Sequence, residues 1–157
     1  MAAGSFFGTW RFSAICFGEV TIAEKQNQLR KTLAELPMAQ DRLAYIVRRG
    51  RAVAALDEAL KTESHRVEGC LAKVWFVSEF KEGRCFFAVD SDSAIVKGIA
   101  VLLCDFYSGQ TPGEILEADP DFLEKFGVTQ HLTPNRRNSL AKIRSAIEMF
   151  ARTQLAE

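Results

Sequence analysis

Residues 72–89, AKVWFVSEFKEGRCFFAV, indicate the fold class of this chain because two apolar runs flank a short polar turn. The runs, residues 72–80 and 84–89, are rich in β-branched and aromatic residues, and Lys81-Glu82-Gly83 separates them. This pattern predicts a β-hairpin. The first run carries large apolar side chains at both odd and even positions, so we expect helices to cover much of at least one face of the hairpin.

Helices are predicted before the hairpin. Thr21-Ile-Ala-Glu24 has the capping-box pattern, in which the threonine and glutamate side chains bind free amides at a helix start. Pro37 should end this first helix. A second helix is expected to follow and to end at Gly50, since glycine is common just after the last helical residue.

Helices are also predicted after the hairpin. Residues 93–107 carry apolar side chains around nearly the whole helical circumference, which predicts a central buried helix. Three later helix starts combine a capping side chain with proline: Thr111-Pro112, Asp119-Pro120 and Thr133-Pro134. The sequence therefore predicts an α+β domain in which N-terminal and C-terminal helices pack around a small antiparallel sheet of about three strands.

Composition bounds the domain organisation and the classes of partner. The 157 residues fit one domain, expected at residues 23–157, with residues 1–22 as an N-terminal extension without fixed structure. Twenty basic and twenty acidic residues cancel, so no net field favours nucleic acid. No apolar run approaches the roughly 20 residues that cross a bilayer, so no membrane partner is expected. The first residues lack the arginine richness of a transit peptide, which favours a cytoplasmic protein.

The four cysteines, Cys16, Cys70, Cys85 and Cys104, form no CxxC pair, which favours reduced thiols. Cys85 lies in a predicted strand and Cys104 in the apolar helix, where a cysteine usually packs as a small hydrophobic residue. Cys16 lies in the N-terminal extension. Cys70 is therefore the remaining candidate for a reactive thiol.

Cys70 lies where a loop enters the first strand, in the stretch HRVEGCLAKVWF that begins at His65. Gly69 before it relaxes the backbone, and His65, Arg66 and Lys73 could stabilise a thiolate or steer an anionic partner. From these residues alone, a core cysteine at a strand start and a functional cysteine both remain open.

The two histidines offer further alternatives. His65 could act as a base toward Cys70, but the five positions between them set no fixed geometry. His131, in the stretch TQHLTP, could be a metal ligand or a surface group at a helix start. A cysteine hydrolase or thiol oxidoreductase is disfavoured, because no orienting residue or resolving cysteine is recognisable.

Four blocks of the sequence resemble the SufE family of sulfur acceptor proteins, which includes the CsdE relatives. The first, Val67 to Trp75, is similar to the family pattern V-x-G-C-x-x-x-V-W, and residues 90–98, DSDSAIVKG, are similar to its DSDAAIVKG signature. Residues 108–112 resemble its SGxTP turn, and residues 132–140 resemble its LTPxRxxGL block. Leu71-Ala72 departs from the family, which usually has a polar pair after the cysteine.

The resemblance implies an IscU/SufE-like fold and a role in iron–sulfur cluster assembly. Cys70 would accept a sulfane sulfur, as a persulfide, from a pyridoxal-phosphate cysteine desulfurase of the SufS or CsdA kind, and would deliver it to a SufB-containing scaffold. The protein would stimulate the desulfurase and hold no cofactor or metal itself, acting as a carrier more than as an independent enzyme. Val67, Leu71 and Val74 would shelter the persulfide between encounters.

The resemblance also marks residues around the thiol. The candidate loop residues and modulators are Gly69, His65, Lys73, Asp90 and Asp92. Arg136, which falls on the arginine of LTPxR, and Arg66 beside the loop are candidate partner-binding residues. An IscU-like metal or iron–sulfur scaffold is the alternative function, although such a site needs three or four converging ligands and the cysteine spacing argues against it.

Overall fold

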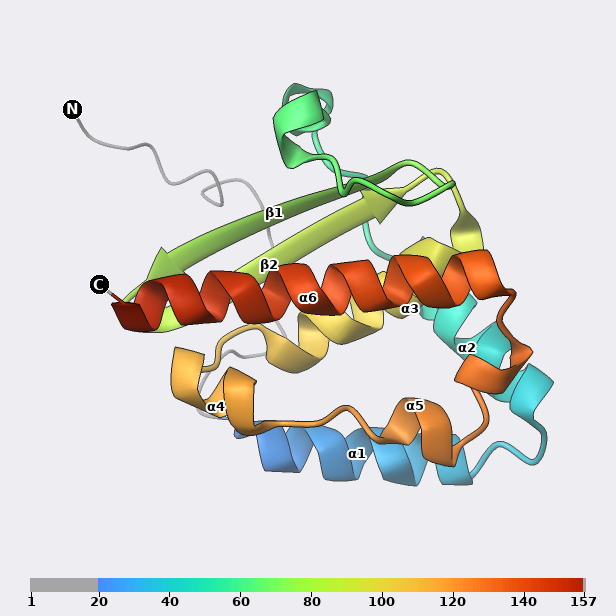
Figure 1. Ribbon diagram of the computed structural model, residues 1–157. Helices are drawn as coiled ribbons and strands as arrows, with labels where there is room; N and C mark the ends of the chain where they lie inside the picture. Colours follow the sequence, from blue (N-terminus) through green and yellow to red (C-terminus); the bar gives the residue numbers. More distant parts are fainter. Residues whose placement is uncertain (1–19, 157) are drawn as a thin grey trace.

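The computed structural model describes residues 20–156, so Cys16 and most of the predicted extension, residues 1–22, lie outside the described residues. The elements, in chain order, are α1 (Ile22–Ala34), α2 (Ala39–Arg51), η1 (Glu58–Leu60), η2 (Glu63–His65), β1 (Val74–Lys81), β2 (Arg84–Ser91), α3 (Ala94–Tyr107), α4 (Pro112–Glu117), α5 (Phe122–Lys125), η3 (Thr129–His131) and α6 (Pro134–Ala156). Helices lie before and after one hairpin, which confirms the predicted α+β class (Figure 1).

Strands β1 and β2 form a two-stranded antiparallel sheet, where about three strands were expected. Every residue of β1 pairs with one of β2. Glu82 and Gly83 form the turn with φ angles of 53° and 78°, the left-handed geometry of a tight hairpin turn. A backbone bridge joins Cys85 to Gln110, but within residues 20–156 it does not extend into a third strand.

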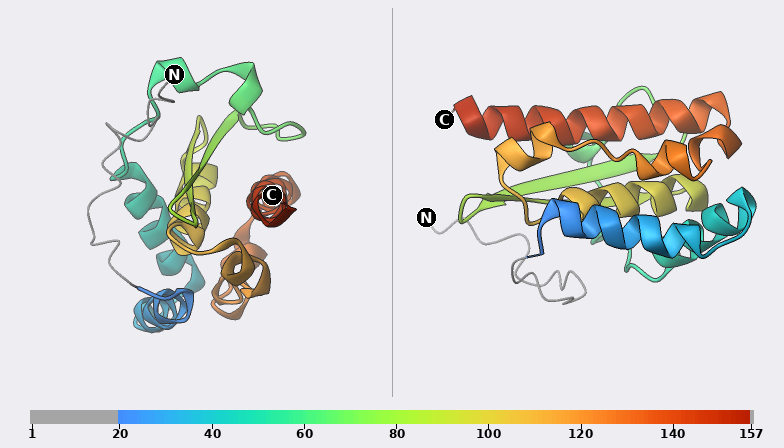
Figure 2. Two further views of the ribbon diagram at one scale, coloured as in Figure 1. Left: turned by 90° about the vertical axis from the view of Figure 1, so that its left-hand side faces the viewer. Right: turned by 90° about the horizontal axis from the view of Figure 1, so that it is seen from below.

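Helices cover one face of the hairpin, as expected, and an irregular segment covers part of the other. On the first face, Phe87 stacks on Phe76 with ring centroids 5.6 Å apart and meets Phe150 of α6 edge-on at 5.8 Å. On the second face, Leu56 and Leu60 pack against the outward side chains of the strands. The end-on view in Figure 2 shows the hairpin between α6 and the chain that leads away from α2.

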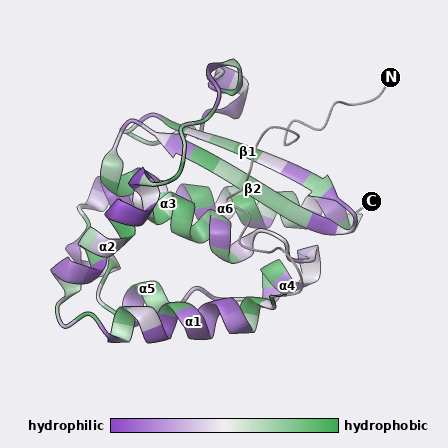
Figure 3. Cartoon of the chain, turned by 180° about the vertical axis from the view of Figure 1, so that it is seen from behind, coloured by the Kyte–Doolittle hydropathy of each residue, from purple (hydrophilic) through white to green (hydrophobic). Residues whose placement is uncertain are grey.

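Helix α3 is the centre of the core, as its apolar sequence predicts. The Ser93 hydroxyl caps its start by accepting the N–H of Val96 at 3.3 Å. Figure 3 shows that hydrophobic residues concentrate in α3 and the hairpin, whereas α1 is largely hydrophilic. No helix of the described chain combines the length and the apolar character that a membrane span requires.

Gly50 lies inside α2, so its prediction as the residue that ends that helix is wrong. A Cβ atom at Gly50 would lie 2.5 Å from the Cα atom of Gly98 in α3, a separation that real Cβ atoms do not show. The reciprocal Cβ atom at Gly98 would lie 2.9 Å from the carbonyl oxygen of Ile46. The two glycines therefore let α2 and α3 pack backbone against backbone.

Two of the three predicted proline-containing helix starts, Thr111-Pro112 and Thr133-Pro134, are confirmed. The third prediction, at Asp119-Pro120, is wrong because α5 begins only at Phe122. The Asp119 carboxylate instead pairs with Arg144 of α6 at 3.5 Å.

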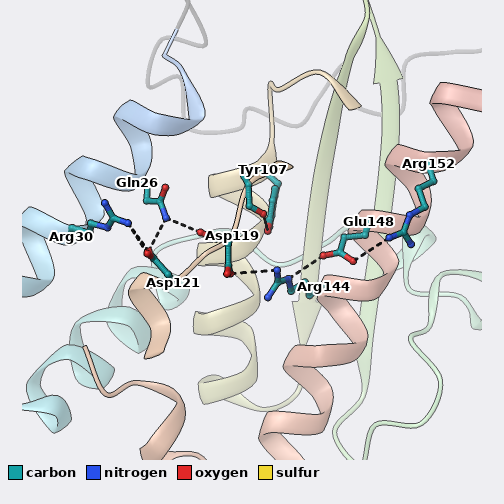
Figure 4. Close-up of polar contacts among 9 residues, drawn as sticks. Gln26, Arg30, Tyr107, Asp119, Asp121, Arg144, Glu148 and Arg152 are labelled. Atoms are coloured by element: carbon teal, nitrogen blue, oxygen red, sulfur yellow. Dashed lines mark hydrogen bonds and ion pairs between the residues drawn. The ribbon is translucent and has the colours of Figure 1, made fainter. Parts of the chain in front are cut away.

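A polar network joins the start of α5 to α1 (Figure 4). The Asp121 carboxylate accepts hydrogen bonds from Arg30 at 2.7 Å and Gln26 at 2.8 Å, and pairs with Lys125 at 2.7 Å. These contacts, the hydrogen bond from Lys125 foremost, lower the pKa of Asp121 to about 2. Charge pairing thus fixes the chain between α4 and α6 to the first helix.

Candidate functional site

Residues 68–73, termed the Cys loop below, leave and rejoin the sheet at one point. The N–H of Val67 donates to the carbonyl oxygen of Val74 at 2.8 Å, and a backbone bridge joins Arg66 to Trp75. These contacts close the loop at its base, next to the start of β1. In Figure 1 the loop extends from that end of the hairpin toward the N-terminal half of α6.

The thiol of this loop lies between the core and the solvent. Cys70 is half-buried and packs against the main core together with Val67 and Ala72, whereas Val74 is fully buried. Leu71 does not shelter the thiol as predicted, since the residue is 79% exposed. The backbone therefore turns Cys70 inward and its apolar neighbour outward.

Contacts from two other elements hold the Cys loop. Gly69, with φ at +82°, directs its carbonyl oxygen to the side-chain amide of Asn138 in α6, which donates at 2.8 Å. At the other end of the loop, the N–H of Lys73 donates to the Asp92 carboxylate at 2.9 Å, and the N–H of Asp92 donates back to the Lys73 carbonyl oxygen at 3.2 Å. Lys73 and Asp92, two of the predicted loop residues, thus lie side by side, whereas Gly69 is held at the other end of the loop.

Asp90, also predicted beside the loop, lies on the other face of the hairpin from the main core. It is opposite Trp75 in the strand register and only 4% exposed. Its carboxylate accepts the N–H of Leu56 at 3.0 Å and pairs with Lys61 at 3.2 Å and Lys97 at 3.5 Å. Asp90 therefore holds residues 56–61, the chain that leads to the Cys loop, rather than the thiol itself.

The charge of Asp90 is maintained by these contacts. Burial alone would raise the pKa of its carboxyl group, but hydrogen bonds from the Ser91 and Leu56 N–H groups, with Lys61 and Lys97 nearby, outweigh burial and lower that pKa. The same ion pair raises the pKa of Lys61 against the opposing effect of desolvation. Asp90 is thus a buried, charged residue whose carboxylate accepts two backbone hydrogen bonds and pairs with two lysines.

The His65 ring makes its hydrogen bonds to residues other than Cys70. Within the described chain, the hydrogen bonds of the His65 ring all lie in residues 60–65, and its Nδ1 is 2.8 Å from the Leu60 carbonyl oxygen. Because a carbonyl oxygen only accepts, Nδ1 carries the proton. His65 thus orders the chain before the Cys loop, and the contacts do not place it as a base for the thiol.

The two arginines predicted to bind a partner differ in their contacts. Arg66 pairs with Glu63 at 3.5 Å. The guanidinium group of Arg136, in the first turn of α6, makes no hydrogen bond or ion pair with any residue in the range 20–156, although the side chain is half-buried. Arg136 is therefore available to a carboxylate on another molecule.

The other two described cysteines are structural, as predicted. Cys85 is fully buried, and burial raises the pKa of its thiol to about 11. Burial also raises the pKa of Cys104 in α3 well above its ordinary value. In the described part of the chain, no three His, Cys, Asp or Glu side chains gather where they could hold a metal ion, and His131 is exposed.

Two residues of α6 that contact the Cys loop were not predicted from the sequence. Asn138 donates to the Gly69 carbonyl oxygen, and the Lys142 side chain lies so close that a Cβ atom at Gly69 would be 3.3 Å from its Cε atom. Asn138 and Lys142 are four residues apart and share one face of α6. That spacing is visible in the sequence, but nothing in it indicates that the face meets the loop.

Comparison with known proteins identifies the family of this chain. A family model for SufE, the Fe-S metabolism associated domain, matches residues 27–151. The chain is 35% identical over 94 residues to an uncharacterized SufE-like protein of Synechocystis sp., covering 60% of this chain and 59% of that protein. It is 41% identical over 92 residues to SufE-like protein 1, chloroplastic/mitochondrial, of Arabidopsis thaliana, covering 58% of this chain and 25% of that protein. The chain thus aligns with less than two thirds of either relative.

The fold has a counterpart among solved structures. The solution structure of a hypothetical protein from Thermus thermophilus superimposes with a TM-score of 0.68 at 21% identity, covering 85% of this chain and 97% of that one. At this identity the likeness establishes the arrangement of elements alone. The family model, which spans the Cys loop, α3 and most of α6, establishes more: the chain belongs to the SufE family and carries its Fe-S metabolism associated domain.

Proposed function

We propose that this protein is a sulfur acceptor for iron–sulfur cluster assembly, with Cys70 as the carrier. The Cys70 thiolate attacks the sulfane sulfur of a cysteine persulfide on the partner, and a new S–S bond forms on Cys70. The S–S bond of the donor breaks, and the donor cysteine leaves as a thiolate. The partner is a pyridoxal-phosphate cysteine desulfurase of the SufS or CsdA kind, and the recipient is a SufB-containing scaffold.

The observation that carries the proposal is the position of Cys70 relative to the other described thiols. Cys85 and Cys104 are buried with raised pKa values, so neither supplies a thiolate at neutral pH. Cys70 is half-buried on a loop whose two ends are held by hydrogen bonds. Such a loop can shelter a persulfide from reductants and still present it when the loop opens.

Docking is assigned to the surface beside the Cys loop. Arg136 lies in the first turn of α6, two positions before Asn138, which contacts the loop. Its guanidinium group has no partner within residues 20–156. Arg66 lies at the base of the loop. An arginine that binds a carboxylate of the desulfurase at this position would bring the donor persulfide near Cys70. The same contact would serve the stimulation of the desulfurase.

The test is to incubate the protein with a SufS-type desulfurase and cysteine and to measure the intact mass. The wild type should gain about 32 Da, the mass of one sulfur atom, and lose it on treatment with a thiol reductant. Cys70→Ser should gain nothing, whereas the control Cys85→Ala, which alters a buried thiol, should gain the same mass. An adduct that persists in Cys70→Ser refutes the proposal.

A further inference from the structure

We propose that Asn138 is a positioning residue that controls how often the Cys loop opens, an inference that rests on the proposed function of Cys70. Its side-chain amide donates to the carbonyl oxygen of Gly69, the residue next to the thiol, across 69 positions of sequence. At 2.8 Å this is a short N–H···O bond. We refer to it below as the loop latch.

The backbone at Gly69 is arranged for this contact. The φ angle of +82° is one that glycine adopts readily and other residues rarely adopt. The Lys142 side chain, one turn further along α6, occupies the space beside Gly69, with its Cε atom 3.3 Å and its Nζ atom 3.7 Å from where a Cβ atom would lie. The first part of the loop is thus set against α6 by a hydrogen bond and by packing.

The hydrogen bond between Lys73 and Asp92, at the other end of the loop, constrains a different part of the chain. Asp92 binds the N–H of Lys73, directly before β1, and holds the end of the loop that continues into the sheet. Cys70 lies next to Gly69 and three residues before Lys73. Release of the latch would therefore free the peptide that carries Cys70 while the base of the loop stays closed.

The latch also connects the loop to the proposed docking residue. Arg136 and Asn138 lie in the first turns of α6, two positions apart. Because side chains two positions apart point to different sides of a helix, a partner must cover both sides of these turns to bind Arg136 and also compete for the Asn138 amide. Docking and exposure of the thiol would then occur together, which confines an open persulfide to the complex.

The magnitude expected follows from the exposure of the bond. A single hydrogen bond of this class changes an equilibrium by about 2- to 10-fold. Loss of the latch should raise the population of open loop, and with it the reaction rate of Cys70, by about that factor. The free energy of unfolding should fall by no more than the equivalent of that fold-change, so the variant stays folded.

The experiment measures alkylation of the full-length protein by limiting iodoacetamide, with labelled positions identified by peptide mass. Asn138→Ala should alkylate Cys70 about 2- to 10-fold faster than the wild type. The matched control Asn135→Ala changes an exposed asparagine one turn earlier in the same helix, whose side chain makes no hydrogen bond within residues 20–156, and should leave the rate unchanged. Cys85 and Cys104, which are buried, should stay unlabelled in both variants.

Equal rates of Cys70 alkylation in Asn138→Ala and the wild type would overturn the proposed role of Asn138. If Asn138→Ala also exposes Cys85 and Cys104, the variant has unfolded, and Asn138→Asp decides instead. Aspartate keeps the shape but removes the donor, so a wild-type rate in that variant likewise overturns the proposal. Failure of the latch and of the function are distinguishable, because wild-type protein that gains no sulfur refutes the function even where Asn138→Ala accelerates alkylation.

Discussion

Replacement of Asp90 by alanine is expected to destabilise the fold strongly without acting on the thiol directly. The carboxylate is buried, accepts the N–H groups of Leu56 and Ser91, and pairs with Lys61 and Lys97. Alanine removes all four interactions at once. The chain that precedes the Cys loop then loses its hydrogen bond and its ion pair to β2 and keeps the packing of Leu56 and Leu60 against the strands.

The size of the loss follows from the groups left behind. An unsatisfied buried N–H, as at Leu56, costs about 1–3 kcal/mol. Removal of one partner from a buried ion pair costs about 3–5 kcal/mol, and the lower part of that range applies because Lys61 and Lys97 remain 18% and 15% exposed. Since the two terms overlap, we expect a loss of about 3 kcal/mol in the free energy of unfolding and a fall in Tm of roughly 6–12 °C.

Urea unfolding measures this loss in the free energy of unfolding for three variants: Asp90→Ala, Asp90→Asn and Asp92→Ala. Asp92 accepts one exposed N–H from Lys73, so its alanine variant should lose about 1 kcal/mol or less. Asp90→Asn keeps an acceptor and should fall between the other two. Equal losses in Asp90→Ala and Asp92→Ala, at unchanged m values, would refute the assignment of Asp90 as a structural residue.

Three further predictions concern other parts of the molecule. Gly50→Ala should lower the free energy of unfolding by about 1–3 kcal/mol through overpacking against Gly98, measured by urea unfolding, and an unchanged midpoint would contradict the close helix contact. The pKa of Asp121 is lowered from 3.8 to about 2, so its ion pairs stabilise the fold above about pH 4 and are lost as the pH falls toward 2. Asp121→Asn should flatten that part of the pH profile of Tm, and a profile identical to that of the wild type would exclude the effect. Arg136→Ala should abolish stimulation of the desulfurase at an unchanged Tm. The control is Arg137→Ala, which changes the exposed neighbouring arginine. If the two variants stimulate the desulfurase equally, Arg136 is not part of the docking surface.

Local sequence signals predicted most of the fold. The capping boxes at Thr21 and Thr111, the polar turn of the hairpin and the apolar circumference of α3 each depend on residues close together in the chain. Such features form wherever their own residues permit. The structure confirms them at nearly the predicted boundaries.

The wrong predictions concern residues whose roles depend on distant contacts. Gly50 has the position of a helix end, and only its approach to Gly98 in α3 explains why it lies within α2. Asp119 precedes proline as a cap would, but Arg144 of α6 binds its carboxylate. Leu71 was expected to shelter the thiol because it is apolar, but the backbone directs it into solvent. Each outcome depends on tertiary geometry that the local pattern does not contain.

In the candidate site, too, some residues could be predicted from local sequence, whereas others depend on distant contacts. Cys70 and Gly69 were predicted from a single sequence block, and Asp92, predicted from another, binds the N–H of Lys73 at the far end of the same loop. Asp90 belongs to the same block as Asp92, but the alternation of side chains along β2 sends it to the other face of the hairpin. Asn138 contacts the loop across 69 positions, and neither composition nor periodicity reveals a contact of that kind.

The most direct test of the central claim is to locate the transferred sulfur. After a single turnover with a cysteine desulfurase, the protein is alkylated, digested and mapped by mass. We predict that a persulfide, about 32 Da heavier than the thiol, lies on the peptide that contains Cys70 and that its sulfur is transferred onward when a SufB-containing scaffold is added. Sulfur on Cys85 or Cys104, or no sulfur on any cysteine of a protein that still stimulates the desulfurase, would contradict it.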